Sequence, residues 1–283
     1  SIHLFTSVEL NPAVYTGTST SVDTRRLYKN FSNVVETNMG GNAGYHSLQA
    51  TLQQQLSHGV SFLFNYTFSK ALDNLPYLTN NSFAQPGQSY VLPIYLPDYK
   101  RLDRGLSDFD RRHNVTFSYV WQIPSWRNAP RGIGLIANGW NTTGIVQFSS
   151  GRPLTVTSSA DLSGTGLLKD RAQIVSGVNF RGPGACSASS GSCINWINPA
   201  AFTTPARGAF GTVQKGFMEG PGYANWDTGL QKYFDITERY RFQFRAEYFN
   251  ILNHTNLLAP VTGVSSAGFG SIKSASDPRI AQL

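Results

Sequence analysis

Residues 239–254 read Arg-Tyr-Arg-Phe-Gln-Phe-Arg-Ala-Glu-Tyr-Phe-Asn-Ile-Leu-Asn-His, and this stretch decides the fold. From Tyr240 to Tyr248 every second residue is aromatic or Ala, while the residues between them are Arg, Gln or Glu. A period of two is that of a β-strand, whose successive side chains point to opposite faces. A soluble sheet usually hides Val, Ile and Leu in a packed core. Rings backed by charged groups instead suit a strand with lipid on one side and a water-filled lumen on the other.

The same alternation recurs along most of the chain. Val60, Phe62 and Phe64 alternate with polar residues directly after the tight turn 57–59, which predicts a hairpin with the preceding strand. Each full strand has about nine or more alternating residues, the length that a tilted strand needs to cross a bilayer. The predicted strands are 1–9, 45–56, 60–69, 114–123, 140–157, 223–235 and 240–248, with 279–283 as the start of another.

The connections between these strands alternate between long and short. The long ones are 10–44, 71–109, 158–222 and 255–276, and the short ones are 57–59, 124–138 and 235–238. We therefore predict an all-β fold, part of an antiparallel transmembrane β-barrel with about seven long strands plus a truncated last strand, short periplasmic turns and long extracellular loops. Aromatic residues expected at the short-turn ends, as a periplasmic girdle, are Trp121, Trp140, Trp226 and Tyr240.

Strand alternation also predicts which side chains face lipid of the outer membrane and which face the lumen. The predicted lipid-facing residues are Phe62, Phe64, Tyr66, Phe68, Phe117, Tyr119, Trp121, Tyr240, Phe242, Phe244 and Tyr248. The predicted lumen-facing residues are Arg241, Gln243, Arg245 and Glu247. The charged residues among them could guide a solute or contact a plug, or they could only hydrogen-bond to charges on neighbouring strands.

Composition excludes several classes of protein. Aromatic residues make up 13% of the chain, which argues against disorder, and no apolar run reaches the roughly 18 residues of a membrane helix. A mean hydropathy of −0.23 is compatible with a barrel, because half of each strand is polar. The net charge of +7 raises nucleic acid as a partner, but the basic residues are scattered, with no run longer than Arg25-Arg26 or Arg111-Arg112. We therefore expect no nucleic-acid binding.

The two cysteines, Cys186 and Cys193, lie in a stretch rich in Gly and Ser. Without further Cys or a nearby His pair, a local disulfide is expected rather than a zinc site, and it points to an oxidising compartment. The N-terminus has no basic region, long apolar core or initiator Met, so it does not resemble a signal peptide. We expect the chain to start within a longer protein or after processing.

No pattern of catalytic residues stands out. The sequence has no Gly-x-Ser-x-Gly, His-Glu-x-x-His or Gly-x-x-x-x-Gly-Lys motif, and its histidines are isolated from one another. The densest charge cluster alternates acids and bases: Asp103, Arg104, Asp108, Asp110, Arg111 and Arg112. Closely spaced carboxylates suit Ca²⁺, but the interleaved arginines favour ion pairs at the outer rim. We expect no enzyme activity, no cofactor and no metal site.

Several stretches resemble one family when taken in order. They are Tyr45–Leu52, Gly59–Leu63, Tyr66–Ala71, Leu106–His113, Ser150–Val156, Gly220–Asp227 and Phe242–Asn256, the last being the most diagnostic. These stretches resemble the C-terminal barrel of Oar-like TonB-dependent receptors, outer-membrane proteins that carry a carboxypeptidase-regulatory-like domain. The resemblance spans nearly the whole chain and keeps the family's order.

The resemblance implies a location in the outer membrane of a Gram-negative bacterium. It implies that residues 1–283 are the C-terminal part of a TonB-dependent receptor β-barrel, with the plug, the N-terminal domain and the energy-coupling box absent from this chain. The implied partners are the N-terminal plug of the same full-length chain, a TonB-type energy-coupling protein that binds the missing N-terminus, and an unknown extracellular ligand.

Three functions are weighed on this basis. The leading hypothesis is energy-coupled transport of an unknown ligand across the outer membrane. The alternative is a surface adhesion or interaction protein that binds partners through its long loops without transport. A third, an extracellular β-sandwich that binds carbohydrate, fits the aromatic residues but predicts solubility without detergent, whereas we expect insolubility.

Overall fold

A computed structural model describes residues 2–17, 21–75, 92–158, 160–167, 169–186, 193–235 and 239–283 of the chain. Its main element is an antiparallel sheet in which eight strands pair with one another in chain order. A further two-residue strand, β4 (Gly105–Leu106), pairs with β3. The successive strands are β1 (Ile2–Glu9), β2 (Val35–Ser57), β3 (Val60–Asp73), β5 (His113–Gln122), β6 (Trp140–Ser149), β13 (Tyr223–Asp235), β14 (Arg241–Phe249) and β16 (Ile280–Gln282).

The remaining elements are short and lie in the connections. The helices are η1 (Asp23–Arg25), α1 (Tyr99–Leu102), α2 (Arg131–Ala137) and η3 (Pro199–Ala201). The small strands are β7 (Pro153–Leu154), β8 (Gln173–Ile174), β9 (Arg181–Ala185), β10 (Ile194–Ile197), β11 (Phe202–Thr203), β12 (Met218–Glu219) and β15 (Ser271–Ile272). Within the described residues, no helix combines the length and apolar character that crossing a membrane requires. The fold is therefore all-β and antiparallel, as the alternation predicts.

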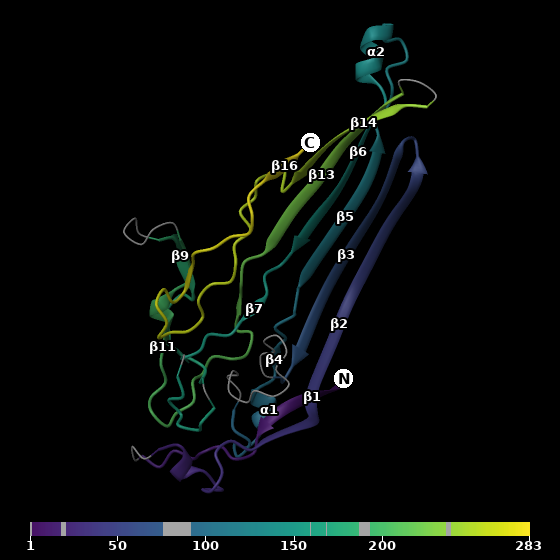
Figure 1. The fold of residues 1–283 in the computed structure, drawn as a ribbon. Coiled ribbons are helices and arrows are strands. Elements are labelled where there is room, and N and C mark those ends of the chain that lie inside the picture. Colours follow the sequence, from purple (N-terminus) through teal and green to yellow (C-terminus); the bar gives the residue numbers. More distant parts are fainter. Residues whose placement is uncertain are drawn as a thin grey trace.

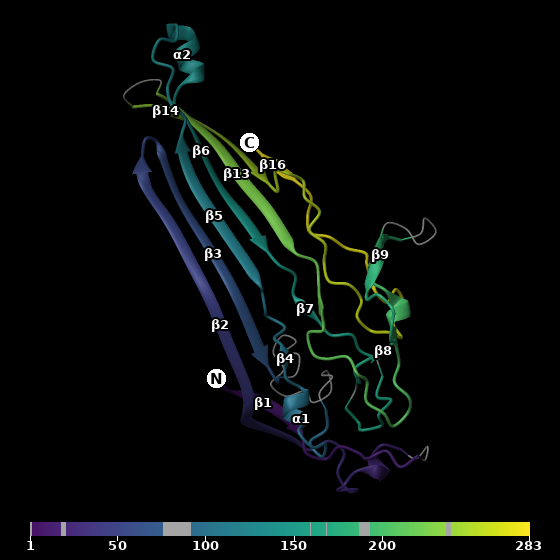
Figure 2. The same cartoon turned by 180° about the vertical axis from the view of Figure 1, so that it is seen from behind.

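The sheet has two different ends, which the two opposite views in Figures 1 and 2 both show. The turn end holds α2 and the β2–β3 turn, where Gln122 donates a backbone hydrogen bond to Gly59. The loop end holds α1, η1 and the small strands of the long connections. The β2–β3 turn is short because His58 and Gly59 both have positive φ angles, 52° and 81°, the geometry of a two-residue hairpin loop.

Strand register places the alternating residues in rows across the sheet. Leu52 lies opposite Phe64, Phe64 opposite Phe117, Phe117 opposite Val146 and Val146 opposite Trp226. Because directly paired residues share a face, one side of the sheet carries this row and is called here the aromatic face. The other side carries a matching row of polar residues, Thr51, Asn65, Thr116, Gln147 and Asn225, and is called the polar face.

The residues predicted to face lipid fall on the aromatic face wherever they belong to a strand. Phe242, Phe244 and Tyr248 of β14 lie opposite Phe234, Lys232 and Thr228. Tyr240 precedes β14, and its side chain is exposed. The predicted lumen-facing residues Arg241, Gln243, Arg245 and Glu247 all lie on the polar face. Which face meets lipid stays a prediction.

Several sequence-based boundaries are wrong. Strand β2 begins at Val35, ten residues before the predicted start, because the polar stretch 35–43 pairs with β1. Strand β6 ends at Ser149 instead of continuing to residue 157. The predicted turn 124–138 contains the helix α2. The turn predicted at 235–238 lies mostly outside the described residues.

The predicted aromatic girdle requires Trp226 to lie at the turn end, but the structure places it elsewhere. It is the fourth residue of β13, which starts at the loop end, and it lies opposite Val146 in β6. Its indole nitrogen donates to the hydroxyl of Tyr119 at 3.3 Å, and that hydroxyl lies 3.1 Å from Oγ1 of Thr228. The Tyr119 ring covers Gly144, where a Cβ would come within 2.6 Å of it. Gly144 therefore leaves room for a ring that reaches across the aromatic face.

One charged residue lies on the aromatic face near the turn end and was not singled out from the sequence. Lys232 is only 1% exposed, and its ammonium group donates to the backbone carbonyls of Leu135, Ile136 and Asn138 at the end of α2. The ammonium also lies 5.3 Å from the centre of the Trp140 ring. Cations bind the free carbonyls at helix C-termini favourably, so Lys232 fixes α2 to the sheet.

The two faces can be told apart by placing the same charge on each. In the full-length protein, Phe64→Arg should lower the free energy of unfolding from a bilayer by about 2–4 kcal/mol, because it puts a guanidinium into lipid. Asn65→Arg, one residue further on and on the polar face, should cost much less. The measurement is urea unfolding in lipid vesicles, and a larger loss for Asn65→Arg would reverse the assignment of the faces.

Candidate functional site

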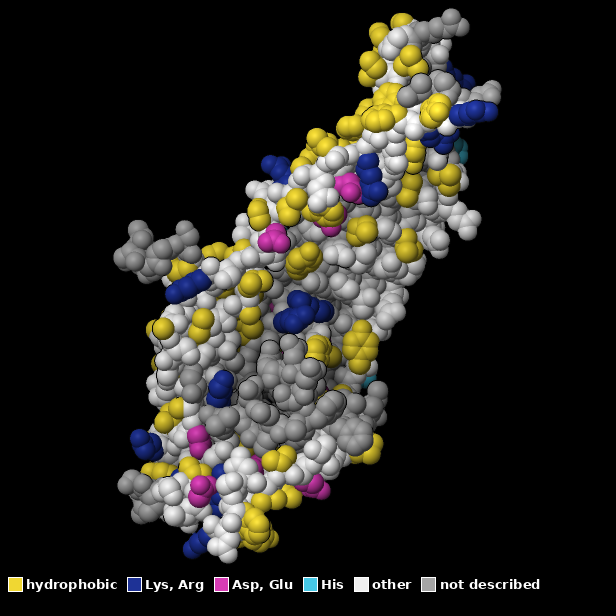
Figure 3. Space-filling view, in the orientation of Figure 1, with side chains coloured by type: hydrophobic (Ala, Val, Ile, Leu, Met, Phe, Trp, Pro, Cys, Tyr) yellow, Lys and Arg dark blue, Asp and Glu magenta, His cyan; other side chains and the backbone are white. Residues whose placement is uncertain are grey.

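A groove of about 360 Å³ crosses the polar face between β2 and β14. Residues lining it include Gln53, Ser61, Ser118, Thr143, Asp227 and Glu247. The Asp227 carboxylate accepts hydrogen bonds from the backbone of Asn250 at 2.9 Å and from Nδ2 of Asn225 at 2.8 Å. In Figure 3 the sheet surface over β2 and β3 is mostly white, with few hydrophobic side chains. This surface suits contact with water or a polar solute.

The four predicted lumen-facing residues take different contacts on the polar face. Arg245 and Glu247 form an ion pair within β14, and Glu247 also lines the groove. The Arg241 guanidinium lies over the Tyr233 ring, 5.5 Å from its centre. Gln243 lies opposite Tyr233 in the register. The structure thus places one carboxylate of the predicted set in the groove, already paired with an arginine beside it.

The stretch from residue 150 to 222, which includes the connection 158–222 predicted to be irregular, contains in its described part a small unit with its own hydrophobic core. The buried residues of this core are Leu154, Val156, Ala172, Ile197, Ala201, Phe202, Val213 and Met218. Phe180, Phe202 and Phe217 pack against one another with ring centres 4.9–6.1 Å apart. We call this the loop unit. Its strands are too short for a period of two to show in the sequence.

Buried ion pairs connect the loop unit to the loop end of the sheet. Lys215 pairs with Asp73, the last residue of β3, and also donates to the carbonyl of Leu75 at 2.8 Å. Arg171 pairs with Asp103, which directly follows α1. Asp73 lies on the polar face, because it is an odd-numbered residue of β3 like Asn65. The loop unit is therefore held on the polar-face side of the sheet.

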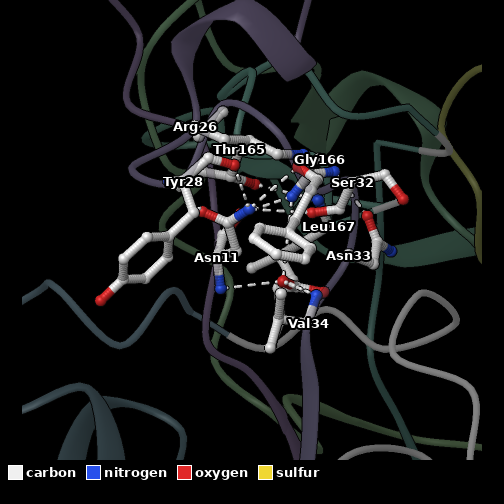
Figure 4. Close-up of polar contacts among 12 residues, drawn as sticks. Asn11, Arg26, Tyr28, Ser32, Asn33, Val34, Thr165, Gly166 and Leu167 are labelled. Atoms are coloured by element: carbon white, nitrogen blue, oxygen red, sulfur yellow. Dashed lines mark hydrogen bonds and ion pairs between the residues drawn. The ribbon is translucent and has the colours of Figure 1, made fainter.

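A second network joins the connection 10–34 to the loop unit (Figure 4). Asn11 donates through Nδ2 to the carbonyls of Tyr28, Phe31 and Ser32 at 3.0–3.1 Å. One buried amide thus links three backbone carbonyls of this connection. Arg26 donates to the carbonyl of Asn11 and to Oδ1 of Asn33.

Two backbone acceptors from the loop unit complete this network. Ala13 donates to the carbonyl of Thr165 at 2.8 Å, and Arg25 donates through Nη1 to the carbonyl of Gly164 at 2.9 Å. At Gly166, whose φ is +80°, a Cβ would come within 2.8 Å of Nη2 of Arg26. Gly166 therefore allows the loop unit to approach the arginine closely.

Asp103 of the charge cluster at residues 103–112 pairs outside the cluster, and not with the adjacent arginines as predicted. Asp103 pairs with Arg171, 68 residues away. Asp110 accepts the backbone N–H of Ala71, and Arg111 donates through Nη1 to the carbonyl of Ser150. Burial lowers the pKa of Arg111, and the charge of Arg152 lowers it further. The reason for the error is that β3 and the loop unit, distant in sequence, offer better partners than the adjacent arginines.

Metal ligands do not gather in the part of the chain that the structure describes: no three His, Cys, Asp or Glu side chains lie together there. Asp161 uses its carboxylate to accept the backbone N–H groups of Thr165 at 2.9 Å and Gly166 at 2.6 Å. Asp170 accepts from the backbone and side chain of Ser163 at 2.7 and 2.6 Å. These carboxylates organise a turn. Between Cys186 and Cys193 the structure has a disulfide.

Breaking the Asp103–Arg171 pair should loosen the loop unit. Asp103→Ala removes the carboxylate that pairs with the buried Arg171 guanidinium, and breaking such a buried pair should cost about 3–5 kcal/mol. The matched control is Arg101→Ala, which removes the exposed Asp98–Arg101 pair and should cost less than about 1 kcal/mol. Limited proteolysis of the full-length protein in intact cells should show faster cleavage near Arg171 only for Asp103→Ala. Equal cleavage of both variants would contradict the structural role of the buried pair.

Asp103 should also make the loop unit sensitive to pH. Burial raises the pKa of its carboxyl to about 6, against the opposing effects of Arg171, the Leu92 N–H and Lys215. A pKa raised on folding favours the folded state most below the unfolded pKa, and this contribution is lost as the pH rises through 6. Lowering the pH from 7 to 5 should therefore slow hydrogen exchange around Arg171 more in the wild type than in Asp103→Asn. An identical pH response in both proteins would contradict the raised pKa.

Sequence reasoning missed most of the residues that hold this site. Asn11 and Arg26 lie in a stretch without strand alternation, and Arg171 and Lys215 lie in the long connection 158–222. The ion-pair partners of Arg171 and Lys215 are distant in sequence, so no spacing rule could have found them. The only local signal was the pair Arg25-Arg26.

Comparison with known families assigns the chain to a class. A family model described as "Outer membrane beta barrel domain" matches residues 1–282. Neither curated proteins nor solved structures gave a significant match.

Proposed function

The chain belongs to the family of outer membrane β-barrel domains and is located in the outer membrane of a Gram-negative bacterium, and from this premise we propose that it is part of a TonB-dependent receptor of the Oar-like type. In this proposal the aromatic face contacts lipid and the polar face lines the lumen. The barrel carries out energy-coupled transport of an extracellular ligand and has no enzyme activity.

The observation that carries the proposal is the loop unit on the polar-face side of the loop end. Asp73, the last residue of β3, holds it there through Lys215, and Asp103 holds it through Arg171. A folded unit above the groove would contact a ligand before it enters the lumen. The groove below offers Asp227 and Glu247 as polar contacts for a solute or for a plug.

Further strands are part of the proposal. Within the described residues, β1 and β16 each pair on one side only. Unpaired strand edges are not tolerated in lipid, because their backbone N–H and C=O groups would have no partner. We propose that other strands of the full-length barrel cover these edges and that its N-terminal plug fills the lumen, with a TonB-type protein supplying the energy.

The rigidity of the loop unit favours a second candidate function. A disulfide and a separate hydrophobic core preorganise its surface, and preorganisation lowers the cost of binding a partner. An adhesion or interaction protein would use such a surface without transport. The two functions differ in whether the lumen can conduct.

The test uses full-length protein from which only the plug is deleted. If the barrel has a lumen gated by a plug, cells producing this variant should become sensitive to a large hydrophilic glycopeptide antibiotic, while cells producing the wild type stay resistant. A second variant without the energy-coupling box should keep the antibiotic out and keep cell attachment normal. Unchanged resistance without the plug, together with lost attachment when the loop unit is removed, would favour adhesion over transport.

A further inference from the structure

The loop end of the aromatic face carries a group of basic side chains. Lys70 of β3 lies directly opposite His46 of β2, and the strand register places both residues on the aromatic face. Nη2 of Arg104 lies over Gly44, 3.7 Å from where a Cβ would stand. The Arg112 guanidinium lies over the Phe68 ring, 5.9 Å from its centre. We call Lys70, His46, Arg104 and Arg112 the basic rim.

The height of the basic rim matches the edge of a membrane. Lys70 is ten residues beyond Val60, which begins β3 at the turn end. A strand rises about 3.3 Å per residue, so Lys70 lies about 33 Å along the strand from the turn. With the tilt of roughly 40° that barrel strands have, this is about 25 Å along the membrane normal, the height of the apolar band. Lys70 and His46 therefore lie level with the headgroups of the outer leaflet.

The ring system just below the rim marks the same boundary. Phe68 is the last aromatic residue of β3 on the aromatic face, and its ring centre lies 5.3 Å from that of His113. Nδ1 of His113 lies 2.9 Å from the hydroxyl of Tyr66. Aromatic rings with polar groups gather at membrane interfaces, where one end is apolar and the other is hydrated. The change from rings to cations thus follows the change from acyl chains to headgroups.

Carboxylates near the rim are directed elsewhere. Among the residues that the structure describes, no member of the basic rim forms an ion pair with Asp or Glu. Asp73 lies on the polar face, and Asp110 accepts the backbone N–H of Ala71. The rim is therefore positively charged, without internal compensation, at the level where lipids carry their phosphates.

We propose that the basic rim binds the phosphate groups of the phosphorylated glycolipid in the outer leaflet, a lipid of the lipid A class. Lysine and arginine form strong charge-assisted hydrogen bonds with phosphate, and basic clusters beside a membrane bind anionic headgroups. Lys70, Arg104 and Arg112 supply the charge, and Phe68 contacts the upper part of the acyl chains. This proposal does not depend on what the barrel transports, but it requires the aromatic face to contact lipid.

The experiment measures lipid A that stays bound to the full-length protein purified in detergent, by mass spectrometry. Lys70→Gln and Arg112→Gln each remove one charge while keeping a long polar side chain. Each substitution should lower the affinity for lipid A about fivefold, since one basic residue at a membrane surface contributes about 1 kcal/mol. The matched control is Arg127→Gln, an exposed basic residue in the connection at the turn end, which should leave bound lipid A unchanged.

Two further measurements test whether the rim recognises the phosphate groups of the lipid, and a third checks that the variants fold. Dephosphorylated lipid A should bind as weakly to the wild type as intact lipid A binds to the double variant that combines Lys70→Gln with Arg112→Gln. Inorganic phosphate in excess should not displace the lipid, because acyl chains add to the affinity. Retention of a folded band on unheated gels shows that each variant has folded. The proposal would be overturned if the folded double variant retained as much lipid A as the wild type. It would also be overturned if the wild type bound dephosphorylated and intact lipid A equally well.

Discussion

Hydrogen bonding between neighbouring strands is the constraint on which the rest of this structure depends. Within lipid no water can satisfy a backbone N–H or C=O, so the chain must pair its strands continuously through the membrane. The unbroken register of β3 with β5 and of β6 with β13 meets this requirement. Once the register is set, alternate side chains lie on opposite faces of the sheet, so that one face can contact lipid and the other can contact water.

Polar groups on the aromatic face are satisfied locally. Lys232 donates to the carbonyls that end α2, and the hydroxyl of Tyr119 lies within hydrogen-bond distance of Trp226 and Thr228. In our proposal this face contacts lipid, which offers no hydrogen-bond partners, so polar groups left without partners there would be costly. At the loop end, Lys70 and Arg112 form no ion pair with Asp or Glu among the described residues, and there we propose the boundary of the membrane. The same face thus changes character with depth.

Buried ion pairs connect the loop unit to the main sheet at the loop end. Asp73–Lys215 and Asp103–Arg171 each connect residues more than 60 positions apart and lie almost fully buried. Such pairs contribute little net stability, but removing one partner is expensive, so they specify one arrangement of the connections. The network around Asn11 and Arg26 acts in the same way for the N-terminal connection.

The sequence by itself determined the strands and their faces, because a period of two is a local property that the side chains from Phe62 to Phe68 or from Phe242 to Tyr248 already show. It also determined the outer-membrane class, since lipid demands that pattern over many strands. Only the tertiary structure decided the early start of β2, the position of Trp226 and the partners of Asp103, Lys215 and Lys232. Each of these depends on a contact between residues distant in the chain, for which local alternation carries no signal.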